Sequence, residues 1–384
     1  MIKLVNDTID ETDISELISW LKTNPHLTKG SLTENFEKNW SEWLGIKYSM
    51  YVNSGSSANL AIITALKASG RLKNDKIVVP AVSWSTTVAP VMQMGLTAIL
   101  CECNRNNLGL DINHLKKICE EENPAAIVLV HVLGIPCSMD QIQKICDEHD
   151  ILLIEDSCES VGSLYKEKMT GTFGIASSFS FFFGHHISTI EGGMVCTNND
   201  ELCEVLKSVR CHGWDRDLSE KCQTELRRKH NIDEFRALYT FYWQGYNLRS
   251  TDLQAKIGLS QMQKIDYVCK KRHENLLLYD KHIKNDFWKL PITQGSYISN
   301  FAYPIITPRI DKLVKALGDN NIETRPLVCG SIGKQPFWKK KYGETNLPFA
   351  DIVHDYGLYL PNNHQITKKN IIKICNIVNQ VLGN

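Results

Sequence analysis

The chain has 384 residues, which is enough for two lobes that each bury a core, and its 43 basic and 43 acidic residues cancel. This balance argues against nucleic acid or an anionic membrane as the partner and favours a small ligand. No apolar run approaches the ~20 residues that cross a bilayer, and the first residues lack a secretion signal, so we expect a cytoplasmic protein.

Apolar runs alternate with amphipathic segments through the first half of the chain. Buried strands are predicted at 76–80, 126–134 and 151–156, and helices at 113–122 and 139–149. This alternation predicts a largely parallel sheet with helices on both faces. Ligands of such sheets bind at the carboxyl ends of the strands.

The second half begins with a polar span at 214–235, which we interpret as an insertion or a lid. A strong helical pattern at 253–283 then predicts one long helix that leads into a smaller lobe. We therefore divide the chain into domains at 1–250 and 251–384.

The thirteen cysteines lie mostly in apolar segments, where reduced thiols pack as small hydrophobic groups. Cys101 and Cys103 have ligand-like spacing, but no second pair completes a tetrahedral site. We therefore expect no bound metal.

Gly55, Ser56 and Ser57 begin a helical run, and a helix N-terminus of small residues can hold a phosphate. The same residues also suit an ordinary helix cap. Trp84 follows the strand at 76–80, where its indole could stack on a planar ligand or pack in the core.

Three acids, Glu155, Asp156 and Glu159, end the strand at 151–156. Asp156 could hold a positively charged ring nitrogen, and Glu159 could face a neighbouring ring oxygen. The alternative is a helix cap with acids in the first turn.

The stretch 180–193 carries Ser180, an adjacent pair, His185 and His186, and a Glu-Gly-Gly turn. One imidazole could act as an acid or base near neutral pH. Adjacent side chains diverge, which disfavours a shared metal, and satisfied polar residues are the alternative.

The order and spacing of these motifs resemble the sugar aminotransferase family of fold-type I pyridoxal-phosphate enzymes, over essentially the whole chain. Six residues before the glutamate of the Glu-Gly-Gly turn, that family carries the lysine that binds the cofactor covalently. This chain has His185 there, and an imidazole cannot form a Schiff base.

The same substitution marks a subgroup, the 3-dehydratases of 3,6-dideoxysugar biosynthesis. The stretches that carry this resemblance are VPAVSWSTT, GTFG, GHHISTIEGG, CHGWDRDL, GYNLRS, IETRPLV and NNHQI. A sibling dehydratase binds an iron–sulfur cluster through closely spaced cysteines, whereas the corresponding region here has only Cys211 and Cys222. We therefore expect no cluster and no partner reductase.

The resemblance implies an aminotransferase-like α/β fold, in which a large domain with a mostly parallel mixed sheet flanked by helices precedes a small α/β domain. It also implies a homodimer with shared sites and pyridoxamine phosphate, or pyridoxal phosphate, as cofactor. The implied cofactor-binding residues are Gly55, Ser56, Ser57 and Ser180 at the phosphate, Trp84 on the ring, Asp156 at its nitrogen, Glu159 at its hydroxyl, and Asn247 reaching the phosphate in a neighbouring subunit.

The implied reaction removes the C3 hydroxyl of a nucleotide-linked 4-keto-6-deoxyhexose, with His185 as base and then acid. The expected substrate is GDP-4-keto-6-deoxymannose; glutamate regenerates the cofactor and ammonia is released. Arg325 is a candidate to grip a carboxylate or sugar diphosphate. His212, Arg216 and Arg249 are further candidates with structural alternatives, and His186 is assigned a structural part.

Two alternatives stay open. The substrate could be a CDP- or dTDP-linked ketosugar, or the chain could be a catalytically inactive relative that only binds sugar.

Overall fold

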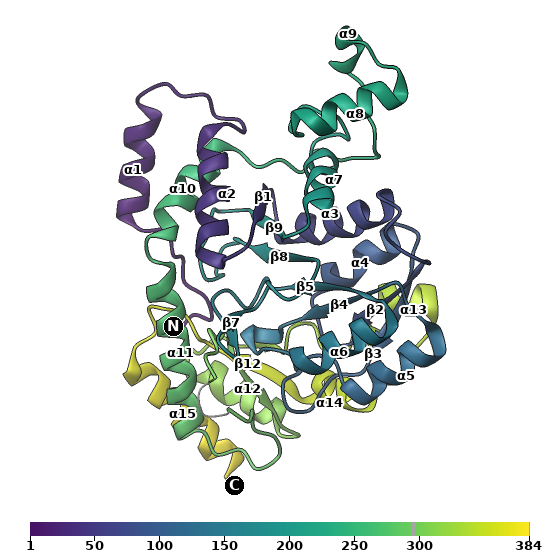
Figure 1. The fold of residues 1–384 in the computed structure, drawn as a ribbon. Helices are drawn as coiled ribbons and strands as arrows, with labels where there is room; N and C mark the ends of the chain where they lie inside the picture. Colours follow the sequence, from purple (N-terminus) through teal and green to yellow (C-terminus); the bar gives the residue numbers. More distant parts are fainter. Residues whose placement is uncertain (293–295, 384) are drawn as a thin grey trace.

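The computed structural model describes residues 1–292 and 296–383. Its centre is a seven-stranded sheet in the order β1-β9-β8-β5-β4-β2-β3 (Figure 1). The strands are β1 (Tyr48–Val52), β2 (Lys76–Pro80), β3 (Thr97–Cys101), β4 (Ala126–Val130), β5 (Leu152–Asp156), β8 (Ala176–Ser180) and β9 (Gly193–Thr197). Strand β9 is antiparallel to both of its neighbours, and the other neighbouring pairs are parallel. The predicted mixed, mostly parallel sheet is confirmed.

Helices cover both faces of this sheet. Val78, Ile127 and Leu153 point to the face that packs on α5 and α6, whereas Ile77 and Val128, which alternate with them, belong to the core beneath α3 and α4. The helices of this part are α1 (Glu11–Leu21), α2 (Ser31–Leu44), α3 (Gly55–Ala68), α4 (Ser85–Gln93), α5 (Ile112–Glu122), α6 (Met139–His149) and α7 (Asp200–Arg210). A small hairpin, β6 (Leu164–Tyr165) and β7 (Lys168–Met169), follows β5.

A second, three-stranded sheet in the order β10-β12-β11 lies in the C-terminal part of the chain. Its strands are β10 (Tyr303–Ile306), β11 (Arg325–Pro326) and β12 (Gly357–Leu360). The helices here are α12 (Ile310–Asp319), α13 (Pro336–Tyr342), α14 (Pro348–Tyr356) and α15 (Lys368–Leu382). The smaller α/β part is thus present, while the domain boundary at residue 250 stays a prediction.

Two predicted elements have different limits. The strand expected at 126–134 ends at Val130, because Leu133 takes a left-handed conformation (φ 52°) within the short helix η1 (Val132–Gly134). The helix expected at 253–283 is two helices, α10 (Asp252–Met262) and α11 (Ile265–His282). The break lies at Lys264, whose backbone is not helical (φ −117°, ψ 4°) and whose Nζ donates to Thr8 O and Asp13 Oδ2.

The polar span at 214–235 contains α8 (Glu220–His230), which has no buried residue, and the start of α9 (Glu234–Ala237). This arm projects from the body beyond α7 (Figure 1). Whether it acts as a lid stays a prediction. Across residues 1–292 and 296–383, no helix has the length and apolar character that a membrane span requires.

Candidate active site

Four connections meet at one edge of the large sheet, because the carboxyl ends of parallel strands lie together. They follow β1, β2, β5 and β8, and they carry the predicted residues from Gly55 to His185. The start of β9 lies at the same edge, since Gly193 pairs with Ser180. Residues far apart in the sequence are therefore collected in one place by the topology.

The first connection brings the N-terminus of α3 against β8 and β9. Ser54 is the helix cap, since its Oγ accepts the Ser57 N–H (3.0 Å). Gly55 and Ser56 thus occupy the first turn, where N–H groups lack partners within the helix. A Cβ on Gly55 would lie 2.6 Å from Ser180 Cβ, and one on Gly193 would lie 2.6 Å from Gly55 N. Both glycines are required by this close packing, and the unpaired N–H groups of the first turn are the kind of donors that bind an anion.

Asp156 ends β5 and is buried. Its Oδ2 accepts from Asn59 Nδ2 (2.8 Å) and Thr87 Oγ1 (2.7 Å), and its Oδ1 accepts the Cys158 N–H (3.1 Å). Ser178 Oγ in turn donates to Asn59 Oδ1 (2.5 Å). Residues 157–163 form turns rather than a helix, so the helix-cap alternative for this acid is wrong. The carboxylate is fixed by neutral donors, and no Lys, Arg or His among residues 1–292 and 296–383 forms an ion pair with it, as suits a group that faces a cationic ligand atom.

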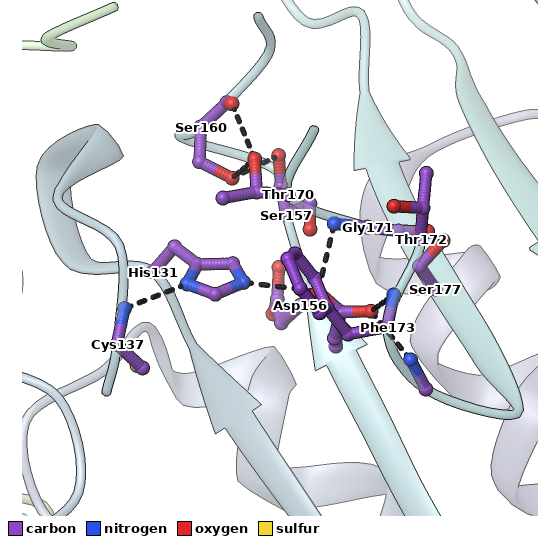
Figure 2. Close-up of polar contacts among 12 residues, drawn as sticks. His131, Cys137, Asp156, Ser157, Ser160, Thr170, Gly171, Thr172, Phe173 and Ser177 are labelled. Carbon is purple, nitrogen blue, oxygen red and sulfur yellow. Dashed lines mark hydrogen bonds and ion pairs between the residues drawn. The ribbon is translucent and has the colours of Figure 1, made fainter. Parts of the chain in front are cut away.

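Glu155 has a structural part that differs from that of Asp156. Its carboxylate accepts the N–H groups of Gly171 (2.8 Å), Phe173 (2.6 Å) and Gly174 (2.7 Å), and it lies 3.1 Å from His131 Nε2. Figure 2 shows His131 between Cys137 and the end of β5. Since the Cys137 N–H donates to His131 Nδ1, the Nε2 carries the proton that is donated to Glu155. This buried cluster anchors the strand end that presents Asp156.

Glu159 lies in the turn after Asp156 and accepts the Leu133 N–H at Oε2 (2.7 Å). Burial raises the pKa of Glu159 to about 7, with this hydrogen bond acting against burial and Asp156 adding to it. The carboxyl group is therefore partly protonated near neutral pH and could donate a hydrogen bond to a ligand oxygen.

Trp84 caps α4 at the end of the connection after β2, and 57 % of its surface is exposed. The core alternative for this residue is therefore wrong. An indole left bare at a strand end offers a flat apolar face to a planar ligand.

His185 lies in the loop between β8 and β9 and is half-buried between aromatic rings. Its ring centroid is 5.1 Å from that of Phe301 and 6.0 Å from that of Phe182. Its Nδ1 is buried and has no hydrogen-bond partner among the described residues. Burial, together with the positive charge of Arg272, lowers the pKa of His185 to about 4. The imidazole is therefore neutral, and a proton acceptor, at physiological pH.

His186 points away into the protein. It is fully buried, and its Nε2 lies 2.9 Å from the carbonyl oxygen of Ser299. Burial lowers the pKa of His186 well below its usual value, so the neutral ring donates to this carbonyl. The pair of histidines thus divides into His185, which is half-buried between aromatic rings, and His186, which ties the loop to Ser299.

A second group of predicted residues surrounds a cavity of about 390 Å³, whose lining includes Asn247, Arg249 and Arg216. Arg249 contacts Asn247 Oδ1 (3.0 Å) and His212 Nε2 (3.4 Å). The backbone beside them lies against the end of β1, where the Asn53 N–H donates to Leu248 O (2.9 Å). These four residues therefore lie near one another, and within the described part of the chain none of them forms a hydrogen bond or ion pair with His185 or Asp156.

Arg216 is also occupied structurally, since its guanidinium stacks on Trp214 (4.0 Å) and donates to Leu238 O (2.7 Å). Arg325 lies on β11, is exposed, and pairs with Glu323 (3.0 Å). Its strand neighbour Tyr359 has its pKa raised to about 12 by burial, with the charge of Glu159 adding to the effect. Within the described residues, Arg325 forms no hydrogen bond or ion pair with Glu159 or Asp156.

The sequence did not single out Asn59, Thr87 or Arg272. Asn59 follows Gly55 by four residues on α3, so helical spacing alone places it on the same face, and this signal could have found it.

Within residues 1–292 and 296–383, no group of three His, Cys, Asp or Glu side chains could hold a metal. Cys101 and Cys103 are buried free thiols.

A model of the DegT/DnrJ/EryC1/StrS aminotransferase family matches residues 7–379. The chain belongs to this family. The order and spacing of the motifs predicted this membership.

Known family members resemble the chain along nearly its whole length. It is 34 % identical over 382 residues to GDP-4-keto-6-deoxy-D-mannose 3-dehydratase of Yersinia pseudotuberculosis, covering 96 % of each chain. It is 29 % identical over 382 residues to GDP-perosamine synthase of Escherichia coli O157:H7, covering 98 % of this chain and 94 % of the relative. A crystal structure of GDP-4-keto-6-deoxymannose-3-dehydratase with a trapped PLP-glutamate geminal diamine superposes with a TM-score of 0.89 at 30 % identity, over 98 % of this chain and 100 % of that one.

Proposed function

We propose that this family member is a pyridoxamine-phosphate-dependent lyase that removes the C3 hydroxyl group of GDP-4-keto-6-deoxymannose. The observation that carries the proposal is His185, a neutral imidazole at the position where sugar aminotransferases carry their cofactor-binding lysine. The name of the Yersinia relative supports the same substrate. The product would be a 4-keto-3,6-dideoxyhexose, a precursor suited to a lipopolysaccharide sugar such as colitose in O-antigen, made in the cytoplasm.

The residues at the sheet edge fit a pyridoxal-type cofactor. Gly55 and Gly193 leave no room for a Cβ, so the main chain at the α3 N-terminus can approach a phosphate closely. Asp156 is held by Asn59 and Thr87 without a counter-charge, and Trp84 leaves an aromatic face bare. We assign the phosphate to Gly55, Ser56, Ser57 and Ser180, the ring face to Trp84, the ring nitrogen to Asp156, and the ring hydroxyl to Glu159.

When bound, this cofactor supplies an amine that condenses with a ketone and a ring that accepts electrons. The chain's own residues supply the rest. Asp156 keeps a ring nitrogen protonated, which strengthens the electron demand of the ring. His185 is unprotonated at neutral pH, so it can accept a proton, and the imidazolium that results can protonate the C3 hydroxyl that departs.

A lysine at position 185 would favour amino transfer, the reaction named for the perosamine synthase relatives. His185 cannot bind the cofactor covalently, so cofactor and sugar would stay free to react through a second proton transfer. This difference favours dehydration over amination. Glutamate is the proposed amino donor that restores the cofactor, and the glutamate adduct in the similar dehydratase structure supports it.

We further propose a homodimer with shared sites. Asn247, Arg249, His212 and Arg216 line or border a cavity apart from His185, which suits residues that serve the site of a second copy. Mixing His185→Asn and Asn247→Ala proteins, each inactive alone, should restore part of the activity, because hybrid dimers contain one intact site. No recovery after subunit exchange would contradict the shared site.

The substrate is tested with a panel of GDP-, CDP- and dTDP-linked 4-keto-6-deoxysugars, incubated with enzyme, glutamate and pyridoxal phosphate. Mass spectrometry should find loss of the C3 oxygen with the GDP-mannose-derived sugar in preference to the others. Dehydration of another nucleotide sugar would replace the substrate assignment, and binding without turnover of any sugar would favour the inactive relative. The matched variant is His185→Lys, which should bind pyridoxal phosphate covalently and lose dehydration.

A further inference from the structure

A buried arginine without a counter-charge stands behind the His185 loop. Arg272 lies on α11, and only 1 % of its surface is exposed. Its Nη1 donates to Phe301 O (2.8 Å) and Asn362 O (2.6 Å), and its Nη2 donates to Gly184 O (3.2 Å) and His185 O (3.3 Å). No carboxylate among the described residues forms an ion pair with it.

Burying a charge in this way is costly, and ion pairs are the usual compensation. Burial lowers the pKa of Arg272 to about 10, so the guanidinium is still protonated at neutral pH. Its planar fork reaches four carbonyl oxygens from three separate segments, which an ammonium group or an apolar side chain could not do. Replacing Arg272 by an apolar residue would leave these four carbonyl oxygens without their donor, so the arginine is tied to the geometry of the three segments.

We propose that Arg272 is a positioning residue for His185, because its guanidinium fixes the backbone of Gly184 and His185 and presents the imidazole to the ligand edge. The inference rests on the proposed function for the reaction that His185 performs, whereas the geometry stands on its own.

Further contacts hold Arg272 and Phe301, the two residues that contact the loop of His185. Asn362 Nδ2 donates to the backbone oxygens of Arg272 (3.0 Å) and Asn300 (3.0 Å), so the α11 position is itself fixed. The Phe301 N–H donates to Leu133 O (2.9 Å), and Leu133 N–H donates to Glu159. The ring of Phe301 packs against His185 and lies beneath the guanidinium (5.6 Å). The loop is thereby connected to the turn that presents Glu159.

The charge of Arg272 acts on His185 as well. The groups that influence the imidazole are Arg272 from α11, which lowers its pKa, and the Phe182 carbonyl in its own loop, which raises it. His186, its neighbour in sequence, has its pKa lowered by burial and Arg272 and is neutral. Removing the guanidinium charge should therefore raise the pKa of His185 and move the acid limb of the rate profile to higher pH.

The test compares Arg272→Met, which removes charge and donors, with Arg272→Lys, which keeps the charge but not the fork. Arg309→Met is the matched control, because Arg309 also donates to two backbone carbonyls, Val381 O (2.9 Å) and Leu382 O (3.1 Å), away from His185. The proteins carry pyridoxal phosphate and labelled histidine, and the His185 signal is identified by its loss in His185→Asn. Its titration midpoint is followed by NMR, beside kcat, KM and thermal unfolding.

Arg272→Met should raise the His185 midpoint and lower kcat about 100-fold with a smaller change in KM, the cost expected for a catalytic group displaced by about 1 Å. Arg272→Lys should keep the midpoint near that of the wild type and recover only part of kcat. Arg309→Met should lower the unfolding temperature alone.

Unchanged midpoint and kcat in Arg272→Met would overturn the proposal, leaving a merely structural arginine. If that variant does not fold, Arg272→Lys tests the proposal. Wild-type kcat and KM in Arg272→Lys would show that the planar guanidinium is not required, and would overturn it. The NMR midpoint requires no sugar, so a wild-type enzyme inactive on every ketosugar would refute the proposed reaction without affecting this measurement.

Discussion

Gly193 offers the sharpest test of the phosphate-binding geometry. A Cβ at this position would lie 2.4 Å from the carbonyl carbon and oxygen of Ser54, whereas nine in ten real Cβ contacts exceed 3.4 Å. These neighbours are backbone atoms, so no side-chain rotation can relieve the clash. Gly193→Ala must therefore push the α3 N-terminus away from β9 by about 1 Å, an overpacking that typically costs about 1–3 kcal/mol of stability.

The same displacement should weaken phosphate binding. Hydrogen bonds to a charged group contribute about 1.5–3 kcal/mol, so misplacing one should raise the Kd for pyridoxal phosphate about tenfold to hundredfold. Equilibrium dialysis and thermal unfolding measure the two effects. Gly318→Ala is the control, because a Cβ there has no neighbour within 4 Å. This helical change should stabilise the protein by about 0.4–1 kcal/mol and leave the Kd unchanged. Wild-type affinity and stability in Gly193→Ala would refute the assigned contact.

Two further substitutions test the carboxylates. The pKa of Glu159, raised to about 7 from 4.5, means that stability is favoured below pH 4.5 and is lost as the pH rises through 7. Glu159→Gln keeps an acceptor for the Leu133 N–H, so urea unfolding should show that the variant is more stable than the wild type at pH 8 and not at pH 5. An equal change of stability with pH in both proteins would contradict a raised pKa of Glu159. Thr87→Val removes a donor to Asp156 and should lower the free energy of unfolding by about 1.5–3 kcal/mol. Thr87→Ser keeps the hydroxyl group and should lower it less. An unchanged free energy of unfolding in Thr87→Val would show that this hydrogen bond does not stabilise the protein.

Local sequence patterns were sufficient for three strands of the large sheet, apart from the end of β4, and for the residues that follow them. β2 matches its predicted limits, and Asp156 ends β5 as expected, because apolar runs and the polar residues that follow them are local features. The resemblance, not periodicity, distinguished His185 from His186. Burial then explains the difference, because His186 is fully buried and bonded to Ser299 O, whereas His185 is only half-buried.

Arg272 was missed because it lies in a Lys-Lys-Arg-His run that is typical of a solvated helix face. Its helical phase carries the signal, since Arg272 follows buried Val268 and Cys269 by four and three residues and precedes buried Leu276 by four. The carbonyl groups that it binds come from residues 184–185, 301 and 362, and no local pattern pairs such distant segments. The break between α10 and α11 has the same origin, because it depends on contacts with the first residues of the chain.

The fate of the glutamate nitrogen tests the central claim most directly. Purified enzyme with pyridoxal phosphate, GDP-4-keto-6-deoxymannose and ¹⁵N-glutamate should release ¹⁵N-ammonia in equal amount to the sugar consumed, together with 2-oxoglutarate and a sugar that lacks its C3 oxygen. His185→Asn should abolish this release. A sugar that carries ¹⁵N at C4, with its C3 hydroxyl intact and no free ammonia, would contradict the account.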